Sequence, residues 1–153
     1  MRTDRRLIGA ESEDRMFVVR GECIRRFARA VGDRTPEHVK GETAPPTFAT
    51  VLRVDVPDIC LDGALLLHGA EEYLYERPIR HNDRLWCRSR IVDIRPHRGR
   101  LGPATMLVTE HVGCDDLGHR VFTSRSTILI SQYVEGSSLD VGSQARRGDA
   151  RTC

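Results

Sequence analysis

Two side chains with acid–base chemistry, Asp33 and His38, stand five residues apart around Pro36. An aspartate and a histidine that meet in one cleft can take up and release protons near neutral pH, because the imidazole titrates there. We expect this segment to be a turn rather than a helix, and a turn can bring both side chains to one cleft. The alternative is an ordinary surface turn, since Asp-x-x-Pro is common turn chemistry.

The element before this segment is predicted from apolar periodicity. A short strand over 16–19 is followed by four apolar residues at the i, i+3, i+4, i+7 spacing of one helix face, namely Ile24, Phe27, Ala28 and Val31. Gly21 and Gly32 bound this helix, and Gly32 suits a C-terminal cap.

The next stretch contains three prolines and a glycine, so we expect loop over 33–46. A second helix is expected over Thr47–Val56, because Pro46 suits the first helical turn and Pro57 ends the helix. The Asp33–His38 segment would therefore lie between two helices.

Four long strands are predicted in the second half, over 65–76, 84–95, 104–114 and 120–131. The last alternates cleanly and places these residues on one face: Phe122, Ser124, Ser126, Ile128 and Ile130. Turn residues lie between the strands, and short turns favour antiparallel neighbours. The expected fold class is α+β, an antiparallel sheet with one main helix packed on a face.

The 153 residues suit one domain, which we place over 16–133. The charged residues 1–15 are expected to be a loose lead-in. The Gly- and Ser-rich residues 134–153 lack apolar periodicity and are expected to be a disordered tail.

Composition argues against several classes of protein. Basic and acidic residues are nearly balanced, 24 against 22, and aromatics make up 5% of the chain, which is unlike a nucleic-acid-binding protein. No apolar run approaches the roughly 20 residues of a membrane span, and none suits a secretory signal. The five cysteines are widely spaced without a C-x-x-C pair, which argues against a disulfide framework or structural zinc. We expect a reduced, cytoplasmic protein.

Three segments resemble the MaoC-like, (R)-specific enoyl hydratase/dehydratase family. Residues 27–38 resemble its hydratase motif, an aromatic-Ala stretch followed by Gly-Asp-x-Asn-Pro-aliphatic-His. Residues 44–48, APPTF, resemble the start of the central helix in the N-terminal dehydratase-type branch of that family. Residues 67–83 resemble the LHGEQEFEYHRPLRxGD block of the same branch. The matching blocks occur in the family's order and cover roughly residues 8–131.

This resemblance implies a hot-dog fold, in which an antiparallel sheet wraps a long central helix, and a homodimer or a heterodimer with a second hot-dog chain. It implies a (3R)-3-hydroxyacyl or trans-2-enoyl thioester as substrate, carried on acyl carrier protein or on coenzyme A. The branch includes small dehydratase subunits of fatty acid and polyketide biosynthesis. No metal or redox cofactor is implied.

Roles for individual residues follow from the same resemblance. His38 matches the base that removes the α-proton, and Asp33 matches the acid that protonates the departing 3-hydroxyl. We expect the backbone around Thr47 and Phe48, at a helix N-terminus, to bind the enolate-like oxygen.

Two further groups of residues are candidates for binding. His68 and Gly69 are expected at the pocket or the dimer interface, although a strand-end histidine bonded to backbone is the plainer interpretation. Arg77, Arg80 and Arg84 are candidates for docking an acidic carrier protein or its phosphate.

The chain departs from the family motif at three points. Thr35 replaces the motif's asparagine, Glu37 replaces an aliphatic residue, and the 38–44 segment is short. These departures leave open a non-catalytic subunit of a heterodimeric dehydratase. A hot-dog thioesterase is a third hypothesis, although it usually needs a carboxylate on or near the central helix and none lies in 44–52.

Overall fold

The structure is a computed structural model that describes residues 5–56, 64–99 and 102–132. The strands are β1 (Arg15–Val18), β2 (Ala64–Tyr75), β3 (Arg84–Gly99), β4 (Gly102–Cys114) and β5 (Arg120–Gln132), and the helices are α1 (Gly21–Val31) and α2 (Pro36–Lys40) with two 3-10 segments, η1 (Arg5–Leu7) and η2 (Phe48–Leu52). The predicted α+β class is therefore correct. The predicted tail over 134–153 lies outside the described residues.

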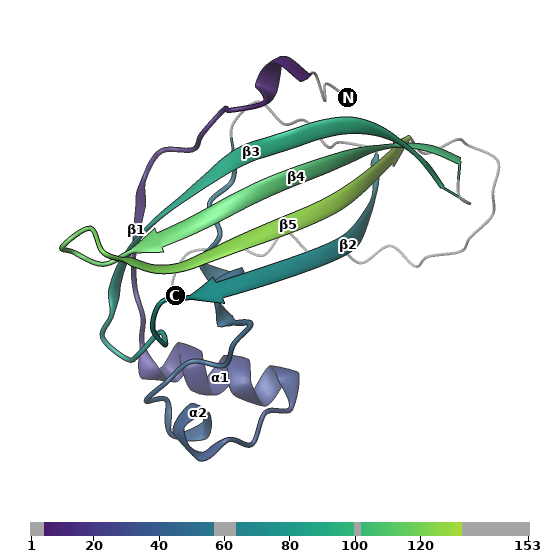
Figure 1. The fold of residues 1–153 in the computed structure, drawn as a ribbon. Coiled ribbons are helices and arrows are strands. Elements are labelled where there is room, and N and C mark those ends of the chain that lie inside the picture. Colours follow the sequence, from purple (N-terminus) through teal and green to yellow (C-terminus); the bar gives the residue numbers. More distant parts are fainter. Residues whose placement is uncertain (1–4, 57–63, 100–101, 133–153) are drawn as a thin grey trace.

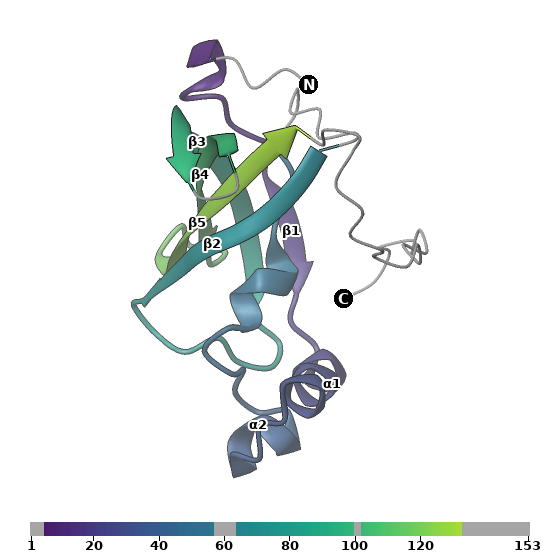
Figure 2. The ribbon, with the colours of Figure 1, turned by 90° about the vertical axis from the view of Figure 1, so that its right-hand side faces the viewer.

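All five strands form one antiparallel sheet in the order β1-β3-β4-β5-β2. The expectation that β2 and β3 are neighbours is wrong, because β2 pairs with β5 at the opposite edge. The connection between β2 and β3 is eight residues long, 76–83, and crosses the end of the sheet instead of forming a hairpin. Helices α1 and α2 lie beyond that end of the sheet rather than across its face (Figures 1 and 2).

Helix α1 has the predicted bounds and cap. Gly32 adopts the left-handed conformation with φ 73°, and its N–H bonds to carbonyls of the last turn. Ile24 and Ala28 are buried as expected, but Val31 is 54% exposed because the helix extends past the end of the sheet. At the N-terminus no side chain of the helix caps it, and the N–H of Gly21 instead donates to Nδ1 of His81 at 2.9 Å.

Two local predictions are wrong. The expected loop over 33–46 contains α2, which begins at Pro36 and is capped by Gly41 with φ 79°, as suits proline at a first turn and glycine after a last one. The expected helix over Thr47–Val56 is only η2, because Arg53 is already extended, with φ −66° and ψ 142°. The long central helix implied by the resemblance is therefore absent from the described residues.

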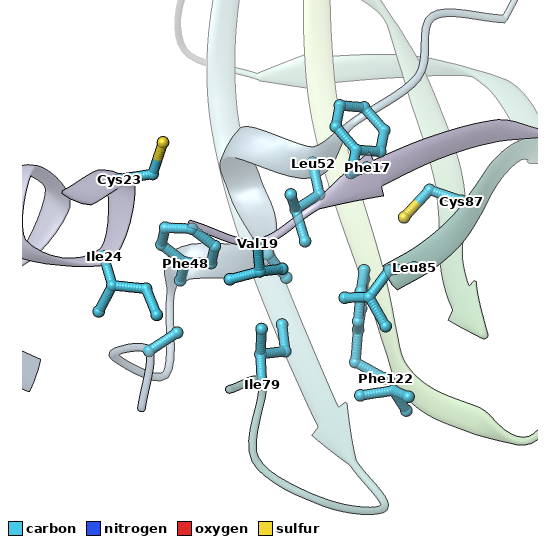
Figure 3. Packing of buried hydrophobic residues seen from close by; sticks show 13 residues of the cluster. Phe17, Val19, Cys23, Ile24, Phe48, Leu52, Ile79, Leu85, Cys87 and Phe122 are labelled. Atoms are coloured by element: carbon cyan, nitrogen blue, oxygen red, sulfur yellow. The ribbon is translucent and has the colours of Figure 1, made fainter. Parts of the chain in front are cut away.

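The core lies on one face of the sheet, where η2 packs (Figure 3). Phe48 and Leu52 of η2 are each 1% exposed and pack with Val19, Ile24 and residues of β3 and β5. A second apolar cluster, farther along the strands, contains Ile91, Ile94, Leu107 and Ile130. The predicted alternation of β5 is confirmed, and the structure shows that the face with Phe122, Ser124, Ser126 and Ile130 is the buried one.

The described part of the expected loose lead-in is attached to the sheet. The N–H groups of Gly9 and Ser12 donate to the carbonyls of Ile91 and Ser89 on β3, each at 2.9 Å. These bonds pair backbone carbonyls on the edge of β3 that the short β1 does not reach. Within the described ranges no helix has the length and apolar composition of a membrane span.

Candidate active site

Asp33 and His38 meet as the spacing predicted. Asp33 follows the cap of α1, and His38 lies in α2, so the turn between the two helices brings their side chains together. Oδ2 of Asp33 lies 2.8 Å from Nδ1 of His38. The two side chains are 20% and 14% exposed, which leaves the pair partly accessible to a ligand.

Hydrogen bonds hold Asp33 in its ionised form. The backbone N–H of Thr35 donates to Oδ1 of Asp33 at 2.8 Å. This bond, followed by those from the Thr35 side chain and from His38, holds the pKa of the Asp33 carboxyl below its usual value. An ionised Asp33 places the imidazole proton on Nδ1 of His38, so Nε2 is the nitrogen left with a free lone pair.

The structure shows how Thr35 and Glu37, two departures from the family motif, lie around the pair. Thr35 reaches Asp33 through its backbone N–H, a contact that does not require the motif's asparagine side chain. Glu37 is exposed in the first turn of α2, where a carboxylate suits the helix N-terminus.

His38 lines a cavity of about 340 Å³. Buried Ala44 and Ile79 form apolar parts of its wall, together with Pro45, Pro46 and the ring of Tyr75. Arg77 and Glu76 also line it. Of the acid–base pair, His38 lines this cavity and Asp33 contacts it through His38. A largely apolar wall beside a few polar side chains is the usual form of a small-molecule site.

A larger cavity of about 580 Å³ lies against Trp86, Arg88 and Arg90. These side chains alternate along β3 with the buried Leu85 and Cys87, so they belong to the other face of the sheet. The polar side chains that line this larger cavity already pair with one another, as Arg88 does with Glu11 and Arg90 with Glu110. We therefore assign the site to the smaller cavity beside His38.

Thr47 and Phe48 do not line the cavity, contrary to expectation. Phe48 is a core residue whose ring packs edge-on against Phe27, 5.4 Å between centroids. Its N–H donates to the carbonyl of Pro45 at 2.9 Å and is not free for a ligand. Because η2 is a 3-10 segment of five residues, the helix dipole expected here is also weak.

His68 and Gly69 lie on β2, and Gly69 forms a β-bulge, unpaired between His68 and Ala70. A bulge changes which residues share a face, so His68 and Glu71 point the same way, and their Nε2 and Oε2 atoms are 3.0 Å apart. This differs from the plainer interpretation of His68 as bonded to backbone. Neither residue lines the His38 cavity.

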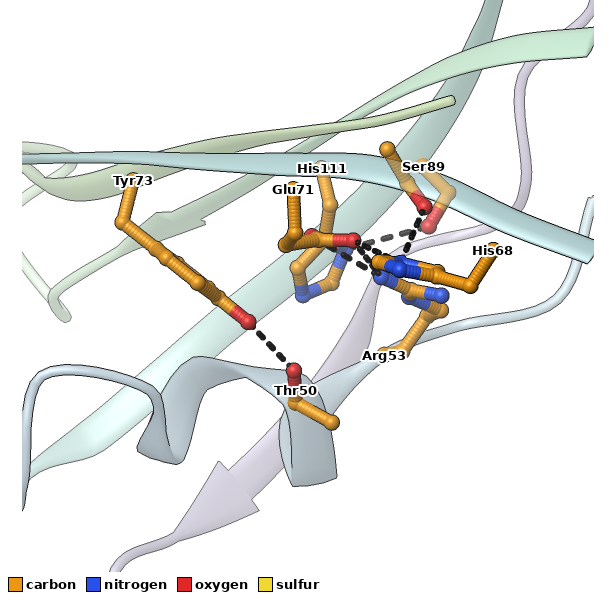
Figure 4. A network of polar contacts seen from close by, with 8 residues as sticks. Thr50, Arg53, His68, Glu71, Tyr73, Ser89 and His111 are labelled. Carbon is orange, nitrogen blue, oxygen red and sulfur yellow. Dashed lines mark hydrogen bonds and ion pairs between the residues drawn. The ribbon is translucent and has the colours of Figure 1, made fainter. Parts of the chain in front are cut away.

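A polar cluster around Glu71 was not predicted from the sequence (Figure 4). Arg53 donates to both carboxylate oxygens of Glu71 at 3.0 Å. Burial alone would raise the pKa of Glu71, but hydrogen bonds from Ser126 and His68 and the charge of Arg53 outweigh it and lower that pKa. Strict alternation along the strand would put Glu71 on the opposite face from His68, so the sequence pattern alone does not bring the two side chains together.

His111 lies next to this cluster and is 3% exposed. Its Nδ1 is 3.0 Å from the hydroxyl of Ser89. Burial, with a smaller effect of the nearby Arg53 charge, lowers the pKa of His111 to about 4, so the ring is neutral at physiological pH.

The three candidate docking arginines are not equivalent. Arg77 lines the His38 cavity and pairs with Asp83 at 2.7 Å. Arg80 is exposed, and its backbone pairs with Thr43, which also lines the cavity. Arg84 instead pairs with Asp116 of the β4–β5 turn at 3.1 Å and does not line the cavity. Only the first two lie where a docking partner could reach the site.

No group of three or more His, Cys, Asp or Glu side chains is placed to bind a metal ion in the described part of the chain. Within the described residues, Cys23, Cys87 and Cys114 are outside any disulfide bond. Burial is the main reason that the pKa of the Cys87 thiol is raised to about 12.

Comparison with solved structures supports the expected architecture. The chain is similar to the HadBC (3R-hydroxyacyl-ACP dehydratase) complex of Mycobacterium tuberculosis, with a TM-score of 0.63, 25% identity and coverage of 86% of this chain and 100% of that one. It is also similar to a MaoC-like dehydratase, with a TM-score of 0.68, 23% identity and coverage of 82% of this chain and 42% of that one. The hot-dog fold and the resemblance to MaoC-like dehydratases are thereby confirmed.

Comparison by sequence places the chain in a family. The UPF0336 protein of Thermobifida fusca (strain YX) is 32% identical over 124 residues, which cover 70% of this chain and 79% of that protein. The family model of the FAS1-like dehydratase domain region matches residues 6–124, including Asp33, His38 and all but the end of the sheet. The chain belongs to the FAS1-like dehydratase-domain family.

Proposed function

We propose that this protein is a (3R)-3-hydroxyacyl-thioester dehydratase, which also catalyses the reverse hydration of a trans-2-enoyl thioester. The observation that carries the proposal is His38, which is bonded to Asp33 and lines a largely apolar cavity, in a chain of a dehydratase-domain family. The cavity suits an acyl group, and the pair suits proton transfer at its C2 and C3 carbons.

The proposed reaction uses His38 as the base. Nε2 takes the C2 proton, the C2–H electron pair forms the C2=C3 double bond, and the C3–O bond breaks. The departing hydroxyl takes the same proton from the imidazolium and leaves as water, which regenerates neutral His38. Ionised Asp33 holds Nδ1–H and stabilises the imidazolium in between.

This assignment changes the role expected for Asp33. The resemblance implied that Asp33 protonates the hydroxyl, but its lowered pKa means that it holds no proton to give at neutral pH. We therefore propose Asp33 as the group that orients and stabilises His38.

We further propose that two hot-dog chains associate through β2. This strand is at the edge of the sheet and carries exposed Leu65, Leu66 and Leu67, as well as Leu74 at 64% exposure. Unpaired edge strands with apolar side chains are typical pairing surfaces. The similar HadBC structure is itself a complex of such chains, and a homodimer and a heterodimer both fit this edge.

We propose that the acyl chain is carried as a thioester on the phosphopantetheine of an acyl carrier protein or of coenzyme A, in fatty acid or polyketide biosynthesis. Arg77 and Arg80, beside the cavity, are the proposed cationic groups for it. The similar HadBC complex is a 3R-hydroxyacyl-ACP dehydratase.

The test is an assay of the purified chain, alone and together with any hot-dog chain that a neighbouring gene encodes. Carrier-bound and coenzyme A-bound 3-hydroxyacyl and enoyl substrates are followed by mass spectrometry. We expect loss or gain of one water, and at least a 100-fold lower rate in Asp33→Asn and His38→Ala. His119→Ala is the matched control, because His119 forms a more exposed pair with Asp115 in the β4–β5 turn.

Three results would contradict the proposal. Full activity in both variants would exclude the pair as the catalytic group. Activity that needs the second chain but survives His38→Ala would make this chain a non-catalytic subunit. Release of free thiol without an enoyl product would indicate a thioesterase.

A further inference from the structure

Three alternate residues of β2 each bind the segment that contains η2. Oη of Tyr75 donates to the carbonyl of Pro46 at 2.5 Å, Oη of Tyr73 lies 2.5 Å from Oγ1 of Thr50, and Glu71 accepts both hydrogen bonds from Arg53 at 3.0 Å. The contacts run in order, so residues 71, 73 and 75 of the strand meet residues 53, 50 and 46 of the segment. We call this set of three contacts the β2 ladder.

The spacing of the two elements explains the ladder. Alternate residues of a strand are about 6.6–6.8 Å apart along its axis. The contacted residues of the segment are four apart, from 46 to 50, and three apart, from 50 to 53, and three residues of a 3-10 segment advance by about 6 Å. The bulge at Gly69 determines the face, because Glu71 lies opposite Ser126, Tyr73 opposite Ser124 and Tyr75 opposite Phe122, all on the inner side.

The segment depends on these contacts more than a long helix would. Its 3-10 residues are confined to Phe48–Leu52, and the chain is already extended at Arg53. Apolar packing holds Phe48 and Leu52 in the core (Figure 3), whereas the exposed Thr50 is held from the sheet side by Tyr73 (Figure 4). Core packing and the β2 ladder therefore hold different residues of the same short segment.

The ladder ends at the candidate active site. Pro45, Pro46 and Tyr75 all line the cavity beside His38. The Tyr75 ring is fixed from two further sides, with its centroid 6.3 Å from that of Tyr73 and 6.1 Å from that of Phe122. Burial raises the pKa of Tyr75 to about 12, so its hydroxyl stays a neutral donor at physiological pH.

We propose that Tyr75, Tyr73 and Glu71 are positioning residues, which hold Pro46 and η2 so that the cavity keeps a fixed wall against the substrate at His38. The inference rests on the proposed dehydratase function. A fixed wall matters most in the transition state, because a small displacement of the reacting carbon from the base lowers the rate strongly.

The test alters one contact of the β2 ladder at a time, with the variants Tyr75→Phe, Tyr73→Phe and Glu71→Gln. Trp86→Phe is the matched control, because it removes a hydrogen bond of similar length, 3.0 Å from Nε1 to Asp116, on the other face of the sheet. Amide hydrogen exchange over residues 47–53 reports the anchoring. The values of kcat and KM, measured well below the melting temperature, report its effect on the reaction.

We expect Tyr75→Phe to speed exchange over 47–53 at least fivefold and to lower kcat about tenfold with less than a threefold change in KM. Tyr73→Phe and Glu71→Gln should have progressively smaller effects on kcat, because Thr50 and Arg53 do not line the cavity. Trp86→Phe should change neither exchange over 47–53 nor kcat.

Different failures have different meanings. Unchanged exchange in Tyr75→Phe, or faster exchange with unchanged kcat, overturns the positioning role while the proposed function stands. A fall in kcat equal to that of Trp86→Phe also overturns it. A wild-type protein that is inactive on every thioester, with and without a second hot-dog chain, overturns the proposed function and the positioning role together.

Discussion

Oδ2 of Asp33 lies 2.8 Å from Nδ1 of His38, although Asp33 follows the end of one helix and His38 lies within the next. Gly32 ends the first helix in the left-handed conformation and Pro36 begins the second, and the turn between them brings the side chains together. The pair is therefore a product of local chain geometry, and it responds to changes in that geometry and in pH.

The first prediction concerns the pH dependence of stability at Asp33. The pKa of this carboxyl is lowered in the folded protein from 3.8, so the unfolded chain binds a proton more readily in acid. The stabilisation from Asp33 is complete above that unfolded value and is lost as pH falls toward the folded value. Urea unfolding at pH 7 and pH 3 should show a smaller acid-induced loss in Asp33→Asn than in the wild type. An equal loss in both proteins would contradict the interpretation.

The second prediction concerns His111, which is buried and has a pKa lowered to about 4 from 6.5. Below pH 6.5 the His111 side chain is protonated in the unfolded chain, whereas in the folded protein it stays neutral down to about pH 4. At 1.36 kcal/mol per pKa unit, unfolding free energy should fall by about 2 kcal/mol between pH 7 and pH 5.

The measurement is chemical unfolding of the wild type and His111→Asn at both pH values. The variant should lose most of this pH dependence, whereas His119→Asn, which changes an exposed side chain, should retain it. A wild type with equal stability at pH 7 and pH 5 would argue against a buried neutral His111.

The third prediction concerns the contact between the two glycines Gly21 and Gly41. Gly41 has φ 79°, and a Cβ there would overlap the backbone carbonyl of Gly21. Gly41→Ala should therefore lower the free energy of unfolding by about 2–3 kcal/mol, from left-handed strain plus the displacement of α2 from α1.

Gly118→Ala is its control, because Gly118 has φ 80° but nothing within 4 Å of an added Cβ. That variant should lose only about 1 kcal/mol from backbone strain. Thermal unfolding compares the two, and equal losses would mean that the close approach at Gly41 is unimportant.

The fourth prediction separates the arginines that were candidates for docking. If a carrier protein or coenzyme A binds beside the cavity, Arg80→Glu should raise KM at least fivefold through charge repulsion of the phosphate. Arg84→Glu should have little effect, because Arg84 pairs with Asp116 away from the cavity. Steady-state kinetics with carrier-bound substrate at low and high salt provide the measurement. Equal effects of the two variants would exclude a docking site beside Arg80.

Much of the local structure could be predicted from the sequence because its causes are local. The apolar spacing of Ile24 and Ala28 and the cap at Gly32 determined α1. The alternation from Phe122 to Ile130 determined which residues of β5 share the face that is buried. The proline in the motif was misleading, because Pro36 begins α2 rather than preventing a helix.

The errors concerned interactions between residues far apart in the chain. The position of β2 beside β5 depends on pairing over about 60 residues, which local turn chemistry does not specify. The burial of Phe48 against Phe27, and the loss of a long helix after Leu52, depend on what η2 packs against. Short elements gain most of their stability from such packing rather than from their own propensity.

The sequence by itself determined the acid–base pair, because Asp33, His38 and the two capping glycines act within ten residues of one another. Only the tertiary structure decided what surrounds that pair. The bulge at Gly69 shifts the face on which Glu71 lies. Glu71, Tyr73 and Tyr75 can then contact residues 53, 50 and 46, which lie 18, 23 and 29 residues earlier in the chain. A one-residue irregularity reverses the side to which every later side chain of a strand points, and only the paired strand reveals where it occurs.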